Sequence, residues 1–374
     1  MIWVRVALVL NVLISSGCSL SYLAHVSWGQ LSLMHERRNI QEAIDEGIFS
    51  KDEIEKLKLI QEVREFAIHD LHLSSPSSKS YQKVVPLSRD SVVYAVVVCP
   101  QDSLKPLTWT FPFSGEVSYL GFFNLEKAKN TQTEYEEDHY DVYVRGVSAY
   151  STLGWFEDPI YSTMLRYAHD QLVNLVIHEL MHETVYLKGK TDFNEGLATF
   201  VGNQGALLFL EKKFGKKSKY YQHALDDQAD EALFSNFMKE SSVALQKYYT
   251  QSLPREEKIK QRGGQFEKIK GRFQKLKPKL KLPGYRSFDR MTWNNAVFAG
   301  WGQYLSHLDV FEKVWIQNNR NLVQLVQYFK EQEEILSEQE NPIEYLNQVF
   351  SAIRRTDLRL GGQIIFALDA RLKD

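Results

Sequence analysis

The chain has 374 residues, of which 44% are hydrophobic and 13% aromatic, and its formal net charge is −2. This length allows one large domain or two small ones, and the composition is that of a folded globular protein with a sizeable core. A nearly neutral chain predicts no nucleic-acid partner, and two cysteines, Cys18 and Cys99, cannot form the disulfide framework of a small secreted protein.

The first eighteen residues predict a targeting segment that lies outside the folded domain. Arg5 precedes an apolar stretch over 6–14, which is shorter than the roughly twenty residues that span a bilayer. Small residues at 15–17 lead to Cys18, an order that resembles the lipobox of bacterial lipoproteins, whose cysteine carries the lipid. That pattern prefers leucine at the position that Ser15 occupies here, so an uncleaved signal anchor is the alternative. Both interpretations place the protein in the bacterial cell envelope, tethered to a membrane and facing the periplasm, and Ser19 favours the outer membrane.

Residues 19–374 predict a single α+β domain in which a small, mostly antiparallel sheet packs beside a larger helical part. Apolar residues at three- and four-residue intervals predict helices over 22–72. Ser50 and Glu53 predict a capping box at the start of the second of them. A β-rich segment over 90–150 follows. Its strands are expected at 91–98, 116–123 and 140–147, with a short helix from 126.

The rest of the chain lacks strand alternation and predicts helices. The motif helices cover 161–214, with one helix over 161–187 and the next from 195. The C-terminal part, 220–374, is also expected to be helical. Its basic stretch between Lys258 and Lys281 could contact anionic lipid headgroups, and a solvated charged helix face is the alternative.

The first motif helix carries the residues that indicate a chemistry. His178, Glu179 and His182 form the pattern His-Glu-x-x-His, and two histidines four residues apart lie on the same face of a helix. They can therefore bind one metal ion. Zinc lowers the pKa of a bound water to about 7, and Glu179 is placed to accept that proton and pass it to a leaving amine. The pattern predicts a zincin-like active-site helix.

Glu195 is the expected third zinc ligand. Twelve residues separate it from His182, and Lys188-Gly189-Lys190 predicts a turn that folds the second helix back on the first. Two histidines and one glutamate leave the fourth tetrahedral position to water, as a catalytic zinc site requires. The alternative is that Glu195 only stabilises the start of its helix. The missing ligand would then be Asp192 rather than Glu183, which is turned about 100° away from His182.

Four residues are candidates for supporting roles. Asp192 and Asp170 are candidates to orient the zinc-bound histidines. Tyr304 and His307 are candidates to stabilise an oxyanion. The strand at 140–147 could lie at a sheet edge and pair with an extended substrate, or it could be an interior strand without a free edge.

The stretch 142–199 resembles the bacterial putative aminopeptidase family, predicted zinc-dependent enzymes associated with membranes. The residues that carry the resemblance are 147–156, 178–182 and 193–195, with further agreement at 17–18, 29–31, 37–38 and 293–296. It implies a gluzincin-type site in which His178, His182 and Glu195 bind zinc and Glu179 is catalytic. It also implies an aminopeptidase, although no residue indicates how a substrate's free amine would be held.

We therefore expect zinc-dependent hydrolysis of peptide substrates by a lipid-anchored protein. One alternative is a noncatalytic membrane-anchored envelope protein with a structural or vestigial metal site, which a fourth protein ligand would favour. Another is a zinc hydrolase that cleaves a non-peptide amide.

Overall fold

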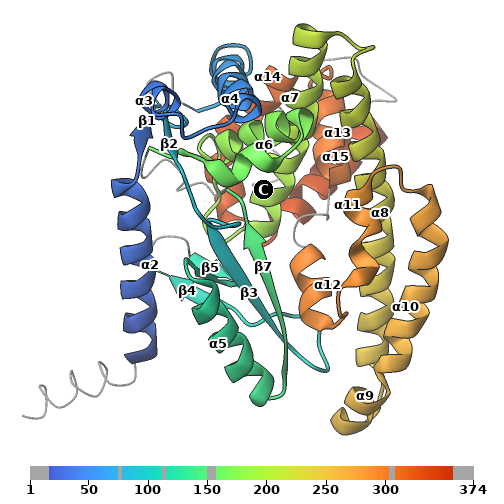
Figure 1. The fold of residues 1–374 in the computed structure, drawn as a ribbon. Coiled ribbons are helices and arrows are strands. Elements are labelled where there is room, and N and C mark those ends of the chain that lie inside the picture. The colour runs from blue at the N-terminus through green and yellow to red at the C-terminus, as the bar shows by residue number, and fades with distance from the viewer. Residues whose placement is uncertain (1–16, 75–77, 112–114, 150–156, 303–307, 357–374) are drawn as a thin grey trace, which may run out of the picture.

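The computed structural model of the chain describes residues 17–74, 78–111, 115–149, 157–302 and 308–356 (Figure 1). Within these ranges small sheets pack beside a larger helical part, which confirms the predicted α+β class. All strand pairs are antiparallel except one, between β2 and β8. Among the residues described, no helix combines the length and the apolar character needed to cross a membrane.

The N-terminal segment is helical, as predicted. Its helices are α2 (Gly17–His35), α3 (Ile40–Asp45) and α4 (Lys51–His69). The predicted capping box begins α4: the Ser50 hydroxyl accepts a hydrogen bond from the Glu53 amide, and the Glu53 carboxylate accepts one from the Ser50 amide at 2.8 Å. Two of the backbone N–H groups at the start of α4 are thereby satisfied without tertiary contacts.

The main sheet has three strands in the order β6-β3-β7. The central strand β3 (Val93–Pro100) pairs antiparallel with β6 (Leu120–Phe122) and β7 (Tyr140–Val147), and β7 has the predicted bounds. The strand predicted at 116–123 is wrong as a single element, because the chain bends at 118–119. Its first half is β5 (Gly115–Val117), which pairs with β4 (Trp109–Phe111). Helix α5 (Leu125–Glu137) follows β6.

A third sheet shortens the long helix predicted over 161–187. Strand β8 (Ile160–Tyr161) pairs with β2 (Lys83–Val85), which pairs in turn with β1 (Arg38–Asn39). The 3-10 helix η1 (Ser162–Arg166) comes next, and the α-helix α6 covers only His169–His182. Its pairing with Val85 holds Tyr161 in an extended backbone conformation, so the α-helix cannot begin at Tyr161.

The remaining helices agree with the predicted helical C-terminal half. They are α7 (Thr191–Phe214), α8 (Lys219–Tyr249), α9 (Arg255–Gln261), α10 (Gly263–Leu276), α11 (Pro283–Arg286), α12 (Asn295–Gly302), α13 (Leu308–Gln317), α14 (Leu322–Glu338) and α15 (Pro342–Thr356), with 3-10 turns η2 (Lys277–Lys279) and η3 (Phe288–Arg290).

The main hydrophobic core encloses α6. Leu172, Val173, Val176, Ile177 and Leu180 of this helix are fully buried. Burying one such side chain contributes about 1.5–3 kcal/mol, so α6 is held rigidly from behind. A second, aromatic core lies between α8, α10 and α12. Its rings include Phe234, Phe237, Phe273, Phe288 and Trp293.

Candidate active site

Two histidines project from α6 toward α7. His178 and His182 lie one helical turn apart, and their Nε2 atoms are 3.2 Å from each other. Their rings are nearly perpendicular, at 85°. Since the core packs behind α6, the two imidazoles have a fixed separation before any ligand binds, as the sequence pattern predicts.

Glu195 of α7 joins them from the opposite side. Its carboxylate oxygens lie 3.6 Å from Nε2 of His178 and 3.7 Å from Nε2 of His182. Glu195 is the fifth residue of α7, whose N-cap residue is Lys190, so it does not cap the helix. The structure therefore brings together the three predicted ligands, His178, His182 and Glu195, within 4.8 Å of one another.

The three groups fit a zinc ion. In a tetrahedral site with zinc bonds of about 2.0–2.1 Å, neighbouring ligand atoms lie about 3.3 Å apart. The two Nε2 atoms are 3.2 Å apart, and each lies 3.6–3.7 Å from a different oxygen of the Glu195 carboxylate. Two imidazoles and one carboxylate are the donors of many catalytic zinc sites. Across the described ranges, no fourth His, Cys, Asp or Glu joins this group. A set of three protein ligands leaves room for a water molecule.

The charges at the site also favour a cation. Burial lowers the pKa of His182 to about 4, so its imidazole is neutral at pH 7. Burial raises the pKa of Glu195, but His182 and His178 outweigh this effect and leave the pKa below its ordinary value. Burial lowers the pKa of His178, but the Glu195 and Glu179 carboxylates outweigh it and leave the pKa raised. The neutral imidazole of His182 beside the ionised carboxylate of Glu195 is the state that a metal ion binds.

Glu179 lies beside this group without joining it. Its side chain is buried, with 7% of the residue exposed. Among the protein groups alone, burial raises the pKa of Glu179 to about 7, and His178 lowers it only in part. A carboxylate whose pKa is close to the working pH is suited to accept and return a proton.

The connection between the two ligand helices is fixed by a side chain that the sequence pattern did not single out. The Asn194 amide donates to the Leu187 carbonyl at 2.8 Å and accepts from the Leu187 amide at 2.9 Å. Gly189 lies between them with φ +74°, a backbone conformation that favours glycine. Buried Asn194 therefore closes the turn and sets the position of its neighbour Glu195.

Two glycines of α7 let the ligand helices approach closely. A Cβ atom at Gly202 would lie 2.9 Å from Asn174 Oδ1 and 3.3 Å from His178 Cβ. A Cβ atom at Gly205 would lie 3.0 Å from Ile177. The absence of these side chains thus sets the distance between α6 and α7.

A relay of polar side chains flanks His178 and was not predicted. Asn174 donates to Asn203 at 2.5 Å, and Asn203 donates to Glu231 of α8 at 2.6 Å. Burial raises the pKa of Glu231 to about 7, and His178 is among the charges that act on this carboxylate. The relay joins α6, α7 and α8 beside the first ligand. Its members lie far apart in sequence and form no local motif.

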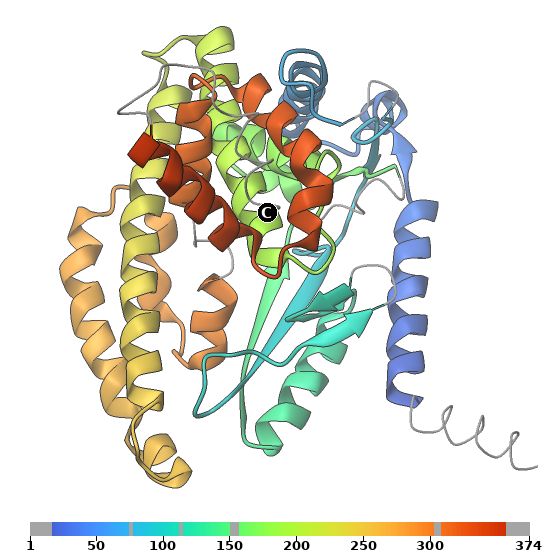
Figure 2. The ribbon, with the colours of Figure 1, turned by 180° about the vertical axis from the view of Figure 1, so that it is seen from behind.

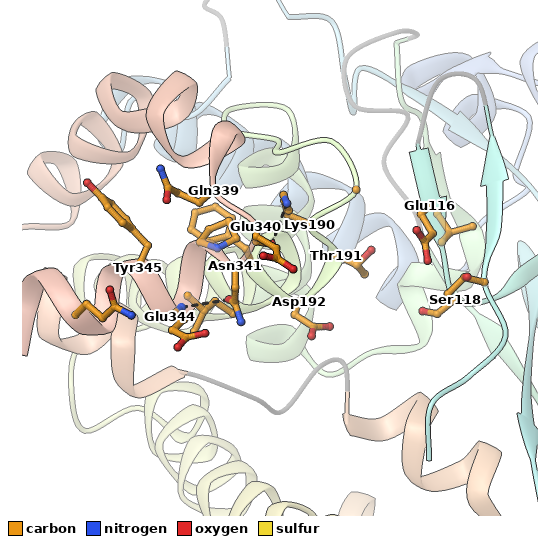
Figure 3. Close-up of a pocket in the computed structure, with 17 residues that line it drawn as sticks. Glu116, Ser118, Lys190, Thr191, Asp192, Gln339, Glu340, Asn341, Glu344 and Tyr345 are labelled. Atoms are coloured by element: carbon orange, nitrogen blue, oxygen red, sulfur yellow. Dashed lines mark hydrogen bonds between the residues drawn. The ribbon is translucent and has the colours of Figure 1, made fainter. Parts of the chain in front are cut away.

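Of the carboxylates proposed to orient the histidines, Asp170 pairs with another histidine and Asp192 lies at the protein surface. Asp170 lies on α6 about two helical turns before His178. It accepts a hydrogen bond of 2.6 Å from His223 Nδ1. Asp192 is exposed and lines a polar surface pocket of about 830 Å³, together with Glu116 and Glu344 (Figure 3). Glu183 points away from the site, as predicted, and accepts hydrogen bonds from the hydroxyls of Ser74 and Ser78.

Three predicted residues cannot be placed in the site. Tyr304 and His307 lie outside the described residues. Cys18 lies in the first turn of α2, where the side chains are not described.

Cys99 is a buried free thiol, in agreement with the absence of a disulfide framework. Tyr186 lies near the site, since Glu195 helps burial to raise the pKa of its hydroxyl.

Strand β7 forms an edge of the main sheet in the described part of the chain. The Val142 carbonyl accepts a hydrogen bond from the Asn294 amide rather than from β3, so alternate residues turn their backbone groups outward. In this register Val144 and Gly146 turn outward as well. Arg145 lies between them and acts electrostatically on Glu195, which places this edge close to the three ligands.

Comparison with known proteins gives a match to a protein family. A family model described as "putative aminopeptidase" matches residues 21–342, which include α6, α7 and the edge strand β7. No curated protein and no solved structure matches the chain.

Proposed function

Since the chain belongs to the putative aminopeptidase family, we propose that it is a zinc-dependent peptidase with His178, His182 and Glu195 as ligands. The observation that carries the proposal is the convergence of these three donors beside a buried fourth group, Glu179, that is not one of them. A noncatalytic structural site would be expected to use four protein ligands.

The residues divide the chemistry between them. Zinc bound there would act as a Lewis acid and lower the pKa of a water molecule. Glu179 takes the proton from the attacking water and later delivers it to the leaving amine. Glu195 and the two histidines hold their positions because α6 and α7 are fixed by the core and by Asn194.

The substrate is proposed to bind along β7. An extended peptide can pair with the outward backbone groups of Val144 and Gly146, as in other strand-addition complexes. Arg145, next to both, is placed to interact with a carbonyl or carboxylate of the substrate near Glu195. Release of single amino-terminal residues is supported by the family description alone.

The test is turnover with and without zinc. Protein lacking the first eighteen residues is loaded with zinc or treated with a chelator and assayed on aminoacyl reporters and on an unbiased peptide library. We expect zinc-dependent cleavage of peptide bonds. Zinc-loaded protein that cleaves no peptide would overturn the proposal. Cleavage restricted to a non-peptide amide would instead favour the other hydrolase class.

Glu179→Gln tests the role of the general base. The variant should keep its zinc and lose activity by about 10²- to 10⁴-fold, because the proton acceptor is gone while the ligands remain. Glu183→Gln is the matched control, since its carboxylate is bonded to serines outside the site, and it should keep its activity. Full activity in a zinc-loaded Glu179→Gln variant rules this mechanism out.

We also propose that Cys18 carries a lipid and holds the enzyme at a membrane of the cell envelope. The support is the apolar stretch at 6–14 followed by small residues and the cysteine. Several acyl chains bind a membrane firmly, whereas one binds only marginally. Cys18→Ser removes the residue that would carry the lipid, so it should leave an unprocessed chain, visible by mass spectrometry of the membrane and soluble fractions. Unchanged mass and partition would favour the signal anchor.

A further inference from the structure

Helix α2 is fastened to the body of the protein by one face. The Tyr22 hydroxyl donates to the Gly121 carbonyl at 3.1 Å and accepts from the Gly121 amide at 2.9 Å. The Tyr22 ring packs edge-on against Phe122 at 5.5 Å. Further along, Gly29 lies against Phe123 and Leu33 is buried. The orientation of α2 about its own axis is therefore fixed.

The opposite face of α2 is apolar and exposed. Trp28 is 74% exposed, Leu31 58% and Leu23 38%. Successive residues turn about 100° around a helix, so these three side chains lie within an arc of about 140°. The centre of that arc is opposite Tyr22 and Leu33. An apolar surface is thus held outward on a fixed helix, and we call it the α2 face.

The composition of α2 is unusual for a helix on a protein surface. Its 19 residues include no Asp, Glu, Lys or Arg. A surface helix normally has charged side chains opposite its buried side, whereas α2 has a tryptophan and two leucines there. Tryptophan prefers the level of the lipid headgroups, where its ring is in an apolar surrounding and its N–H can still reach water.

We propose that the α2 face docks on the surface of a phospholipid bilayer. The chain reaches α2 directly from the apolar stretch at 6–14 and from Cys18, the segment that we propose as the membrane tether. Trp28 follows Cys18 by ten residues, which is about 15 Å of helix. The apolar stretch at 6–14 remains in the chain when Cys18 is replaced, and at that distance it keeps the α2 face beside the bilayer, so a weak intrinsic affinity is sufficient for docking.

The other candidate membrane surface, the basic stretch between Lys258 and Lys281, lies on the far flank. Figures 1 and 2 show α10 and α2 on opposite sides of the molecule. Several cations of this stretch already pair with acidic residues of the protein. These pairs include Lys270–Glu267, Lys277–Asp289, Lys281–Asp226 and Arg262–Asp141. One bilayer cannot contact both flanks, and the paired charges favour the α2 face.

The test places a reporter on each surface. Full chain with Cys18→Ser is given one new thiol, either Leu31→Cys or the control Val243→Cys, an equally exposed apolar position on α8. Cys99 is buried, so the new thiol alone takes the environment-sensitive dye nitrobenzoxadiazole. With vesicles of phosphatidylethanolamine and phosphatidylglycerol, the dye at residue 31 should shift to shorter wavelength and be quenched by nitroxide-labelled lipid. The dye at residue 243 should not respond.

Partition of the same chain gives a second readout. Trp28→Glu with Leu31→Glu should weaken vesicle binding by about tenfold or more, because apolar burial is lost and charge is added. Val243→Glu should leave it unchanged. Since α2 has no Asp, Glu, Lys or Arg, high salt should not release the protein.

Three outcomes would overturn the proposal. In the first, the dye at residue 31 does not respond to vesicles. In the second, it is already shielded without them, which would mean that a second copy or another protein covers the α2 face. In the third, binding is lost in high salt, which would assign the membrane contact to the basic stretch.

Discussion

Two clusters of buried and half-buried polar side chains in this protein differ in how completely other groups of the protein satisfy their hydrogen-bonding atoms. Around Asp141 of β7, the Arg262 guanidinium donates to both carboxylate oxygens, at 2.5 and 2.8 Å, and the backbone N–H of Asn295 donates at 2.8 Å. Around Glu195, the two histidines approach no closer than 3.6 Å. The Asp141 carboxylate has its hydrogen-bonding partners within the chain. The Glu195 carboxylate is instead separated from the histidine nitrogens by distances close to those between neighbouring zinc ligands.

This difference separates a structural cluster from a binding cluster. Buried charges are stable when each has hydrogen-bonding partners of opposite charge. The Asp141 cluster meets that condition and joins β7 to α12 through Asn295. In the Glu195 cluster the histidine nitrogens stay 3.6 and 3.7 Å from the carboxylate, and we propose that a bound cation supplies the closer partner. The predictions below test this distinction.

The largest expected effect is loss of the metal. His178→Ala and His182→Ala each remove one of three ligands, and we expect the zinc content to fall from about one equivalent to background. The thermal midpoint of the metal-free protein should fall only modestly, because the apolar residues of α6 that pack into the core are left in place. Elemental analysis and calorimetry would check both expectations. Full zinc occupancy in the double variant would show that the metal binds elsewhere.

The next effect should appear in the structural cluster. Asp141→Asn leaves the partly buried Arg262 guanidinium without its carboxylate, which should cost about 3 kcal/mol of unfolding free energy, the lower end for a buried pair. Zinc affinity should not change. Urea unfolding measures the loss, and the double variant Asp141→Leu with Arg262→Met is the control, since it removes both charges and should cost less. A loss of zinc in Asp141→Asn would show that the two clusters are coupled.

The smallest of the three effects concerns Glu195→Gln. Removing a residue that only orients a zinc ligand typically costs 10- to 100-fold in metal affinity, so removing the charge of a ligand itself should cost about 100-fold or more. The fold should survive, because glutamine keeps the size of the side chain within α7. Zinc titration with a fluorescent chelator measures the change. Unchanged affinity would defeat the assignment of Glu195 as a ligand.

The sequence predicted those parts of the structure that depend on local pattern. The capping box of α4 and the bounds of β7 were confirmed, because each follows from residues that are neighbours in the chain. The two histidines were predicted to share a face by helix periodicity alone. The predicted ligand set also includes Glu195, because a short turn joins its helix to theirs.

Long-range pairs had no such signal. Arg262 lies 121 residues from Asp141, and nothing near either residue indicates the other. The start of α6 was predicted too early for the same reason, since the pairing that holds Tyr161 extended comes from distant Val85. Asn194 was noted only as part of a family motif. Its hydrogen bonds to Leu187 become visible once both helices are in place.

The close approach of α6 and α7 at Gly202 and Gly205 has a consequence for recognising such sites in other chains. Glu195, Gly202 and Gly205 lie at intervals of seven and three residues along α7, hence on one side of that helix. Any protein that builds the same site needs small residues at these positions, although neither takes part in the chemistry. We therefore expect the diagnostic pattern to extend ten residues beyond the glutamate. A search that requires both positions should separate true sites from chance occurrences of the five-residue motif.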